Sequence, residues 1–248
     1  MNKIRIMMVG LMLAGTAITL KAQERDGRIH WQVRGGMGFA AVVSVPNTDD
    51  RLGWHVGGAA DIALSRNGVW RLQPGLQFAQ KGWAFDGFYG NEQIMKSAFS
   101  TRLHYLQLPV LMTARLRLGG ENYLTFKVGP YVAYGLSGKT TLRINDTDHE
   151  ETFSQNHFSD PCNFYGVAYD KENHRVAYPK FNRWDAGLAE GIDLTFGHVI
   201  VGASVALGLT PVSDEIFMGN TLDKAISAVF FGGGPKNFTA ELSVGYQF

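Results

Sequence analysis

The residues that could carry acid–base or metal chemistry in this chain of 248 residues are its seven histidines. His55 lies six positions before Asp61, and either His55 or His104 could act with a loop serine or aspartate in a hydrolase site. However, the sequence contains no G-x-S-x-G and no H-E-x-x-H motif. A second group of histidines shares one stretch with several aspartates, in spacings that match no tight metal template: His149, His157, His174, Asp146, Asp148, Asp160 and Asp170. We therefore predict no catalytic, cofactor or metal site, and we keep an enzyme with an active site at the rim of the fold as an alternative.

A second set of chemically notable residues consists of charges that recur within otherwise apolar segments: Arg34, Asp61, Arg71, Arg115, Arg117, Lys127, Asp185, Asp193 and Glu241. Residues two apart on a strand share a face, so these charges would lie opposite the apolar side chains. Buried charges must pair or find water. We predict a salt-bridged interior network, with a proton or ion path as the sharper alternative.

The elements that would position these charges are segments in which apolar and polar or small residues alternate. They span residues 31–41, 54–64, 69–81, 106–118, 124–137, 184–196, 199–207 and 237–248. Strict alternation is typical of strands with one apolar face. The breaks between the segments alternate in length, with short ones at 65–68, 119–122 and 197–198 and moderate or long ones at 42–53, 82 to about 101, 139 to 180 and 211 to 236. An even strand number with tight turns on one side and long loops on the other is typical of outer-membrane barrels.

The predicted fold class is therefore all-β: an eight-stranded, antiparallel, up-and-down transmembrane β-barrel with short periplasmic turns and long extracellular loops. The interior of such a barrel is just wide enough for its own side chains, so a general diffusion pore is not expected. Glu190 does not fit the pattern of an apolar outer face, because strict alternation places its carboxylate on the lipid side. We favour a bulge near Gly187 to Gly191 that shifts the register; the alternative is that a partner or bound lipid covers the carboxylate. Pro109 and Pro130 each predict a bulge or a local break in the ladder.

The first 22 residues read as a secretory signal peptide. Lys3 and Arg5 precede an apolar run from Ile6 to Leu20, and Ala22 is the expected last residue removed. The run is short for a spanning helix, although an uncleaved N-terminal anchor is the alternative. We expect residues 23–248 to form the barrel domain, in the outer membrane of a Gram-negative bacterium.

Composition limits the other partners. A net charge of +1 without a basic stripe gives no reason to expect nucleic acid, and the lone Cys162 excludes an intrachain disulfide. Membrane lipid is the expected partner of the outer face. The third long break and its neighbours are rich in aromatics, at Phe85, Phe88, Tyr89, Phe153, Phe158, Phe164, Tyr165 and Tyr169, and residues 222–231 could form a short amphipathic helix. Such loops would either pack together as a cap or contact a protein partner.

Aromatic residues on the strands sort into two groups when they are traced through this topology. Trp31, Trp70, Phe126, Phe196, Tyr246 and Phe248 fall near the periplasmic ends, and Trp54, Phe78, Tyr134, Trp184 and Phe238 fall near the opposite rim. Two aromatic belts are typical of a protein anchored at both membrane interfaces. A soluble, lipocalin-like carrier of a small apolar ligand is the alternative, but it gives no reason for this sorting.

Several motifs also resemble a known family. YLQLPVL (105–111), GPYVAYGLSGK (129–139), RWDAGLAEGIDL (183–194), LQPGLQFAQKGW (72–83) and the closing VGYQF are similar to the PorT-like, or porin-family, outer-membrane barrel proteins. The resemblance covers nearly all of the chain after residue 22. It implies a location and a barrel and carries no catalytic residues. Gln107 stands where such proteins often have Glu, and Glu190 where they often have an aliphatic residue. By similarity to outer-membrane proteins generally, Tyr246 and Phe248 would be part of the signal read by the barrel-insertion machinery.

Overall fold

The computed structural model describes residues 29–43, 48–88, 96–144, 149–153, 158, 162–164, 176–178, 181–213 and 235–248. The strands are β1 (Ile29–Val43), β2 (Thr48–Ala63), β3 (Trp70–Phe88), β4 (Lys96–Gly119), β5 (Asn122–Ile144), β6 (His149–Phe153), β7 (Cys162–Phe164), β8 (Val176–Tyr178), β9 (Trp184–Phe196), β10 (Val199–Gly208) and β11 (Lys236–Gln247). None of the described residues belongs to a helix long and apolar enough to cross a membrane.

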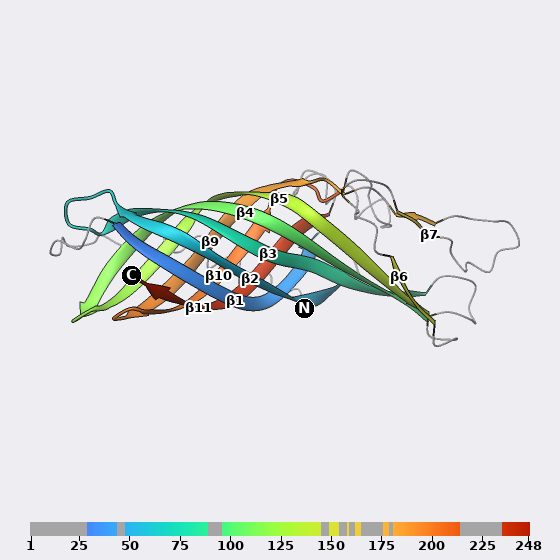
Figure 1. The fold of residues 1–248 in the computed structure, drawn as a ribbon, viewed down its shortest axis with the longest axis horizontal. Coiled ribbons are helices and arrows are strands. Elements are labelled where there is room, and N and C mark those ends of the chain that lie inside the picture. Colours follow the sequence, from blue (N-terminus) through green and yellow to red (C-terminus); the bar gives the residue numbers. More distant parts are fainter. Residues whose placement is uncertain are drawn as a thin grey trace, which may run out of the picture.

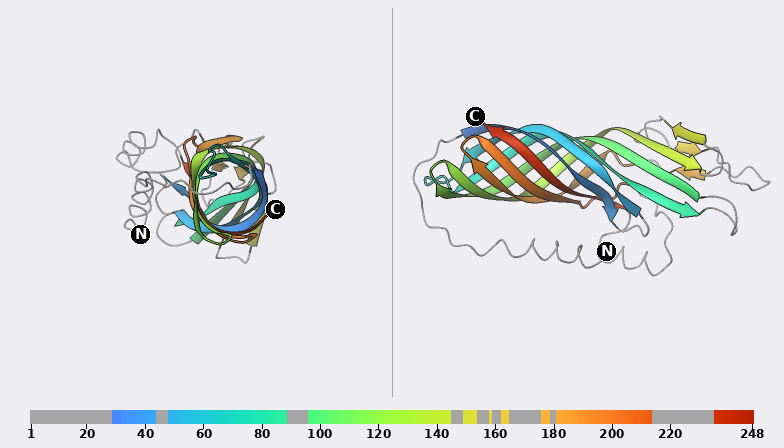
Figure 2. Two further views of the ribbon diagram at one scale, coloured as in Figure 1. Left: turned by 90° about the vertical axis from the view of Figure 1, so that its left-hand side faces the viewer. Right: turned by 90° about the horizontal axis from the view of Figure 1, so that it is seen from below.

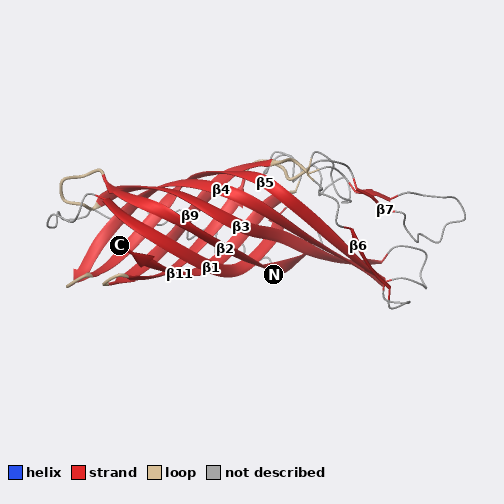
Figure 3. Cartoon of the chain, viewed as in Figure 1, coloured by secondary structure: helices blue, strands red, loops and turns tan. Residues whose placement is uncertain are grey.

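Eight of these strands close into an antiparallel barrel (Figures 1 and 2). Neighbours along the chain pair with each other, β9 pairs with β5, and β1 pairs with β11 to close the circuit. β6 adds to β5 outside this circuit, and β7 and β8 form a separate two-stranded sheet. Figure 3 shows that the body of the molecule is built of strands. The predicted fold class is confirmed.

The strands are staggered around the barrel. The stagger is seen when cross-strand partners are followed around the barrel from Trp31 on β1, whose partner is Ala60 on β2. The circuit comes back to β1 through Phe238 on β11, and the partner of Phe238 is Ala41 rather than Trp31. A return further along the same strand means that the strands tilt against the barrel axis, as Figure 1 shows. For a barrel of this size a tilt of about 35–45° is normal. The tilt brings residues from distant parts of the chain to the same height inside the barrel.

The short connections form where they were predicted. At the first, Gly68 donates to the carbonyl of Ser65 (3.1 Å) and adopts φ +70°, and the Ser65 hydroxyl accepts from the amide of Trp70 (3.0 Å). At the other two, Gly120 and Gly197 each adopt φ +57°, a conformation that other residues rarely take. These glycines let the hairpins reverse within a few residues.

The strands on the opposite side are longer than predicted. β3 runs to Phe88 and β4 begins at Lys96, so most of the predicted break from 82 to 101 is strand, and β5 extends to Ile144. A membrane-crossing strand needs only about 9–11 residues, so the alternation that marks the lipid-facing part ends before the strand does. Several predictions fall outside what the structure describes: the signal peptide, the helix at 222–231, and the side chains of the loop aromatics other than Phe158.

No bulge displaces Glu190, which corrects the interpretation we favoured. β9 pairs without a register shift on both sides, and Glu190 lies opposite Val128 on β5 and Val205 on β10. Two unbroken ladders fix the register, because breaking them would leave backbone groups unpaired in a membrane.

The two prolines interrupt pairing without adding a residue. The β3–β4 pairing passes from Pro74–Val110 to Gln77–Gln107, and the β4–β5 pairing passes from Pro109–Tyr131 to Met112–Val128, each in constant register. This is the ladder break that Pro109 and Pro130 predicted, and no bulge accompanies it. The two register shifts of the β4–β5 pairing lie away from the prolines, between His104 and Tyr105 and between Arg117 and Gly119.

Candidate functional site

The barrel is apolar outside and charged inside. Met37, Val56 and Leu242 are 62%, 53% and 70% exposed on the outer face, whereas Arg71 is fully buried. This inverted distribution is normal for a protein whose outside is solvated by hydrocarbon. The interior is therefore where polar chemistry can occur, and its groups form successive clusters along the barrel axis.

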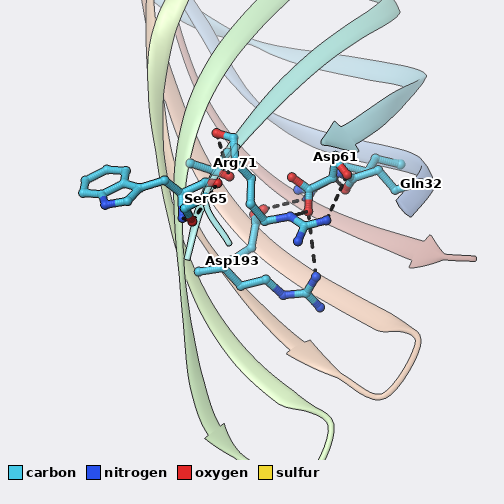
Figure 4. A network of polar contacts seen from close by, with 9 residues as sticks. Gln32, Asp61, Ser65, Arg71 and Asp193 are labelled. Atoms are coloured by element: carbon cyan, nitrogen blue, oxygen red, sulfur yellow. Dashed lines mark hydrogen bonds and ion pairs between the residues drawn. The ribbon is translucent and has the colours of Figure 1, made fainter. Parts of the chain in front are cut away.

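The first cluster lies near the short turns and centres on Asp61. Arg71 Nε donates to Asp61 Oδ2 (2.8 Å) and its Nη2 donates to the Asp61 carbonyl (3.0 Å) (Figure 4). Arg115 Nη1 lies 3.8 Å from the same Oδ2, and its guanidinium stacks 3.8 Å above the Tyr123 ring. One carboxylate from β2 thus holds two cations from β3 and β4.

The second cluster centres on Asp193 of β9. Arg34 Nη2 donates to Asp193 Oδ2 (2.6 Å) and Lys127 Nζ donates to Asp193 Oδ1 (2.8 Å), so the cations come from β1 and β5. Arg34 Nε also donates to Gln32 Oε1 (2.7 Å). Gly202 faces Asp193, and a Cβ there would collide with the carboxylate, so the glycine makes room for the pair.

A third contact joins His55 of β2 and Glu241 of β11, whose Nδ1 and Oε2 atoms lie 2.8 Å apart. A Cβ on Gly36 would collide with the His55 ring, so this glycine leaves space for the imidazole. His55 therefore faces the barrel interior with Glu241 and makes no contact with Asp61 that would suit a rim active site.

The fourth cluster centres on Asp185 of β9, higher in the barrel. Its Oδ2 accepts from Lys81 Nζ (2.9 Å), from Asn237 Nδ2 (3.0 Å) and from the Tyr131 hydroxyl (3.3 Å). Thr210 Oγ1 donates to the other oxygen (3.3 Å). Lys81 Nζ also lies 4.5 Å from the centroid of the Tyr131 ring, so the cation is held between a carboxylate and an aromatic face.

Aromatic side chains close the barrel above this cluster. Phe158, from the third long connection, is 1% exposed and meets Tyr105 at 5.6 Å between ring centroids. Phe181 lies 5.6 Å from Trp83 and 6.5 Å from Phe158. Gly135 lies directly against the Phe158 ring, so a side chain there would displace it. A residue from a long connection thus fills the mouth of the barrel.

A small cavity remains between the charged clusters. It measures about 80 Å³ and is lined by charged and amide side chains that include Arg34, His55, Gln107, Lys127 and Glu241. A space of this size has room for a few waters. Ligand pockets for small organic molecules are typically about 300–1,000 Å³, so the cavity suits water better than a carried ligand.

One member of the predicted interior network lies elsewhere. Arg117 is exposed beside the second short turn, where its Nε donates to the Gly120 carbonyl (2.8 Å). The strand end has left the enclosed part of the barrel there, so alternation no longer implies an interior position. The structure also brings in Lys81, Tyr131 and Asn237, which share the inward parity of the predicted charges and could have been found by that signal.

The strand aromatics lie on the outer surface. Trp31, Trp54, Trp70, Trp184, Phe196, Tyr246 and Phe248 are exposed, and Phe78, Phe126, Tyr134 and Phe238 are half-buried. Neighbours pack in pairs, with 5.4 Å between the rings of Trp54 and Phe78 and 5.0 Å between those of Tyr134 and Trp184. Their anchoring role, and the assembly role of Tyr246 and Phe248, stay predictions.

His104 faces outward near the upper rim. Its Nδ1 lies 3.1 Å from the Ser137 hydroxyl, and its ring stacks on Phe78 at 5.6 Å. In the described part of the chain no carboxylate contacts His104 to orient its ring, so this Ser–His contact lacks the third member of a catalytic triad. Across the same described ranges, no three His, Cys, Asp or Glu side chains gather closely enough to hold a metal ion.

Comparison with known proteins gives one family match, to a model described as "Outer membrane protein beta-barrel domain", over residues 21–214. Among solved structures, Ail of Yersinia pestis in complex with the heparin analogue sucrose octasulfate is 13% identical, with 90% of this chain and 100% of that chain covered and a TM-score of 0.39. Neisserial surface protein A is 7% identical over 90% and 100% of the two chains (TM-score 0.39). OprG of Pseudomonas aeruginosa is 11% identical over 92% and 99% (TM-score 0.38). No curated protein sequence matches the chain.

Proposed function

Since this chain belongs to the family of outer membrane protein β-barrel domains, we propose that it is a non-catalytic scaffold or surface-interaction protein of the outer membrane, acting through its extracellular side. The barrel fixes where the chain lies in the cell envelope. The proposal concerns what it presents there, and the export of the chain through a cleaved signal peptide at residues 1–22 is part of it.

The observation that carries the proposal is the length of the strands beyond the membrane. β4 has 24 residues and β5 has 23, about twice what a crossing needs. β3 pairs with β4 up to Phe88–Lys96, and β6 continues the sheet from the edge of β5. Figure 1 shows these strands projecting well past the ends of β1, β2, β9 and β10. A sheet that continues past the length needed to cross the membrane suits contact with a partner better than transport.

The filled interior argues against a general diffusion pore. Phe158, Phe181 and Trp83 close the mouth, and the clusters around Asp185 and Asp193 cross the lumen below it. A soluble carrier is equally poorly supported, because the remaining cavity is only about 80 Å³. The PorT-like identity suggested by the motifs at 105–111 and 129–139 belongs to the same proposal.

The test replaces residues 146–178 with a short Gly/Ser linker in the full-length protein. We expect the barrel to fold, as judged by its heat-modifiable migration in electrophoresis, while crosslinking to partner proteins in intact outer membranes is lost. Phe158→Ala alone is the control, because it removes the plug side chain and leaves the loop. Unchanged crosslinking in the replaced protein would contradict the proposal.

The rim-enzyme alternative has one observation in its favour, the contact between His104 and Ser137. It predicts that Ser137→Ala abolishes turnover of an ester-bearing lipid by the purified protein. We expect no turnover by either form.

A further inference from the structure

Two cations face each other on the outer surface just above the upper aromatic belt. Arg102 of β4 and Lys139 of β5 are direct cross-strand partners, and both are exposed. Like charges directly opposite each other destabilise an antiparallel pair. In the described part of the chain neither cation has a carboxylate partner or an ion pair. Among the residues that the structure describes, the pair therefore has no anion that neutralises it.

The height of this pair is set by the residues below it. From the middle of the barrel towards the upper rim, the outward-facing residues of β4 are first apolar and then polar. They follow in the order Met112, Val110, Leu108, Leu106, His104 and Arg102. Leu106 lies opposite Tyr134, a residue of the upper belt. Arg102 is four residues beyond Leu106, which places it roughly 10 Å above the belt for a strand rise of about 3.4 Å and a tilt of about 40°. Because the interfacial layer is only about 5–7 Å thick on each side of the hydrocarbon core, Arg102 lies at the outer edge of the lipid head groups, and its long side chain can reach down to their phosphates.

A packed group of side chains around His104 lies directly below the Arg102–Lys139 pair on the outer face. The His104 ring is stacked on Phe78, Phe78 packs against Trp54, and Ser137 holds the His104 Nδ1 at 3.1 Å. Ser137 is also the cross-strand partner of His104, one step below the Arg102–Lys139 pair. An anion between the two cations would therefore rest on an aromatic surface beside a fixed imidazole and a hydroxyl.

We propose that Arg102 and Lys139 bind the phosphate group of a lipid in the outer leaflet, with His104 and Ser137 beneath it. A phosphate between the two side chains replaces one repulsion with two charge-assisted contacts. The planar guanidinium can donate two parallel hydrogen bonds to phosphate oxygens, and the lysine supplies a point charge. The acyl chains of the same lipid would lie on the apolar outward residues of β4 and β5, such as Leu106 and Val132. The proposal rests on membrane insertion and is independent of any protein partner.

The test compares the wild-type protein, R102Q/K139Q and the matched control R66Q/R117Q, which removes the same charge at the opposite end of the barrel. Each is purified in a phosphate-free maltoside detergent and titrated with dipalmitoyl phosphatidic acid, and bound lipid is counted by native mass spectrometry. We expect R102Q/K139Q to bind at least about tenfold more weakly than the wild type, and R66Q/R117Q to bind within about twofold of it. Equal binding by R102Q/K139Q, or an equal loss in the control, would overturn the proposal.

Three further arms separate the alternatives. A phosphate-free glycolipid with the same acyl chains should not be retained, and retention equal to that of phosphatidic acid would refute phosphate recognition. Inorganic phosphate at the same concentration should not displace the lipid, and displacement would reassign the pair as a site for free anions. In lipid-free micelles, R102Q/K139Q should melt at or above the wild-type temperature, because a repulsion has been removed. A lower melting temperature there would mean that the two cations are structural, and heat-modifiable migration shows separately whether each variant has formed a barrel.

Discussion

Removing the charge of Asp61 should destabilise the barrel more than any surface change. Asp61 is 4% exposed and accepts hydrogen bonds from Arg71, which is fully buried, while Arg115 lies 3.8 Å away. Asp61→Asn keeps the shape and an acceptor oxygen, but it leaves two enclosed guanidinium groups without their shared anion. Breaking a buried ion pair by removing one partner costs about 3–5 kcal/mol, and because the amide still accepts a hydrogen bond we expect the lower end, about 3 kcal/mol. That is a factor of roughly 150 in the unfolding equilibrium.

The assay is reversible urea unfolding in lipid vesicles, followed by tryptophan fluorescence. Glu121→Gln is the matched control, because Glu121 is exposed at a short turn and its loss should change the free energy of unfolding by less than about 0.5 kcal/mol. Adding Arg115→Met to Asp61→Asn should recover part of the loss, since it removes one of the stranded cations. If Asp61→Asn changes stability no more than Glu121→Gln does, the reasoning about the interior charges is refuted.

Two further substitutions test other parts of the barrel. Phe158→Ala should lower stability by about 3 kcal/mol, because a fully buried ring is lost from the mouth, and it should raise single-channel conductance in planar bilayers. Unchanged conductance would show that the remaining aromatics, or the clusters around Asp185 and Asp193 below them, seal the lumen without it. Glu190→Leu should instead raise the free energy of unfolding in vesicles by about 1 kcal/mol, because the carboxylate faces lipid between Val128 and Val205. A loss of stability there would mean that the carboxylate has a partner in the membrane.

Side-chain parity was enough to place most of the interior charges, because a strand in a closed barrel has only two faces. Parity alone could not show which of these charges form ion pairs with each other. Arg34 and Asp193 meet across the lumen although they are 159 positions apart, and that meeting depends on the stagger of the whole barrel. Phe158 shows a different limit, because it enters the core from a connection in which no periodicity marks an inward residue. Arg117 has the parity of an interior residue but lies past the enclosed part of the strand.

Glu190 shows how a sequence rule can be outweighed. Alternation correctly placed the carboxylate on the lipid face, and we expected the backbone to yield through a bulge. The structure keeps both ladders of β9 intact, because unpaired backbone amides in hydrocarbon cost several kcal/mol each and one carboxylate costs less. The extended ends of β3, β4 and β5 were missed for a related reason, since backbone pairing continues where the hydrophobic pattern has stopped.

The seam between β1 and β11 joins the first and the last strand of the barrel. Twelve residue pairs hold this seam, from Gln32–Gln247 to Val43–Lys236. Without this seam the other strands form a sheet with two unpaired edges, which is not tolerated in the hydrocarbon of a membrane. A chain without β11 would therefore be an open sheet and not a smaller closed barrel. Its unpaired edges would be accessible to proteases and chaperones.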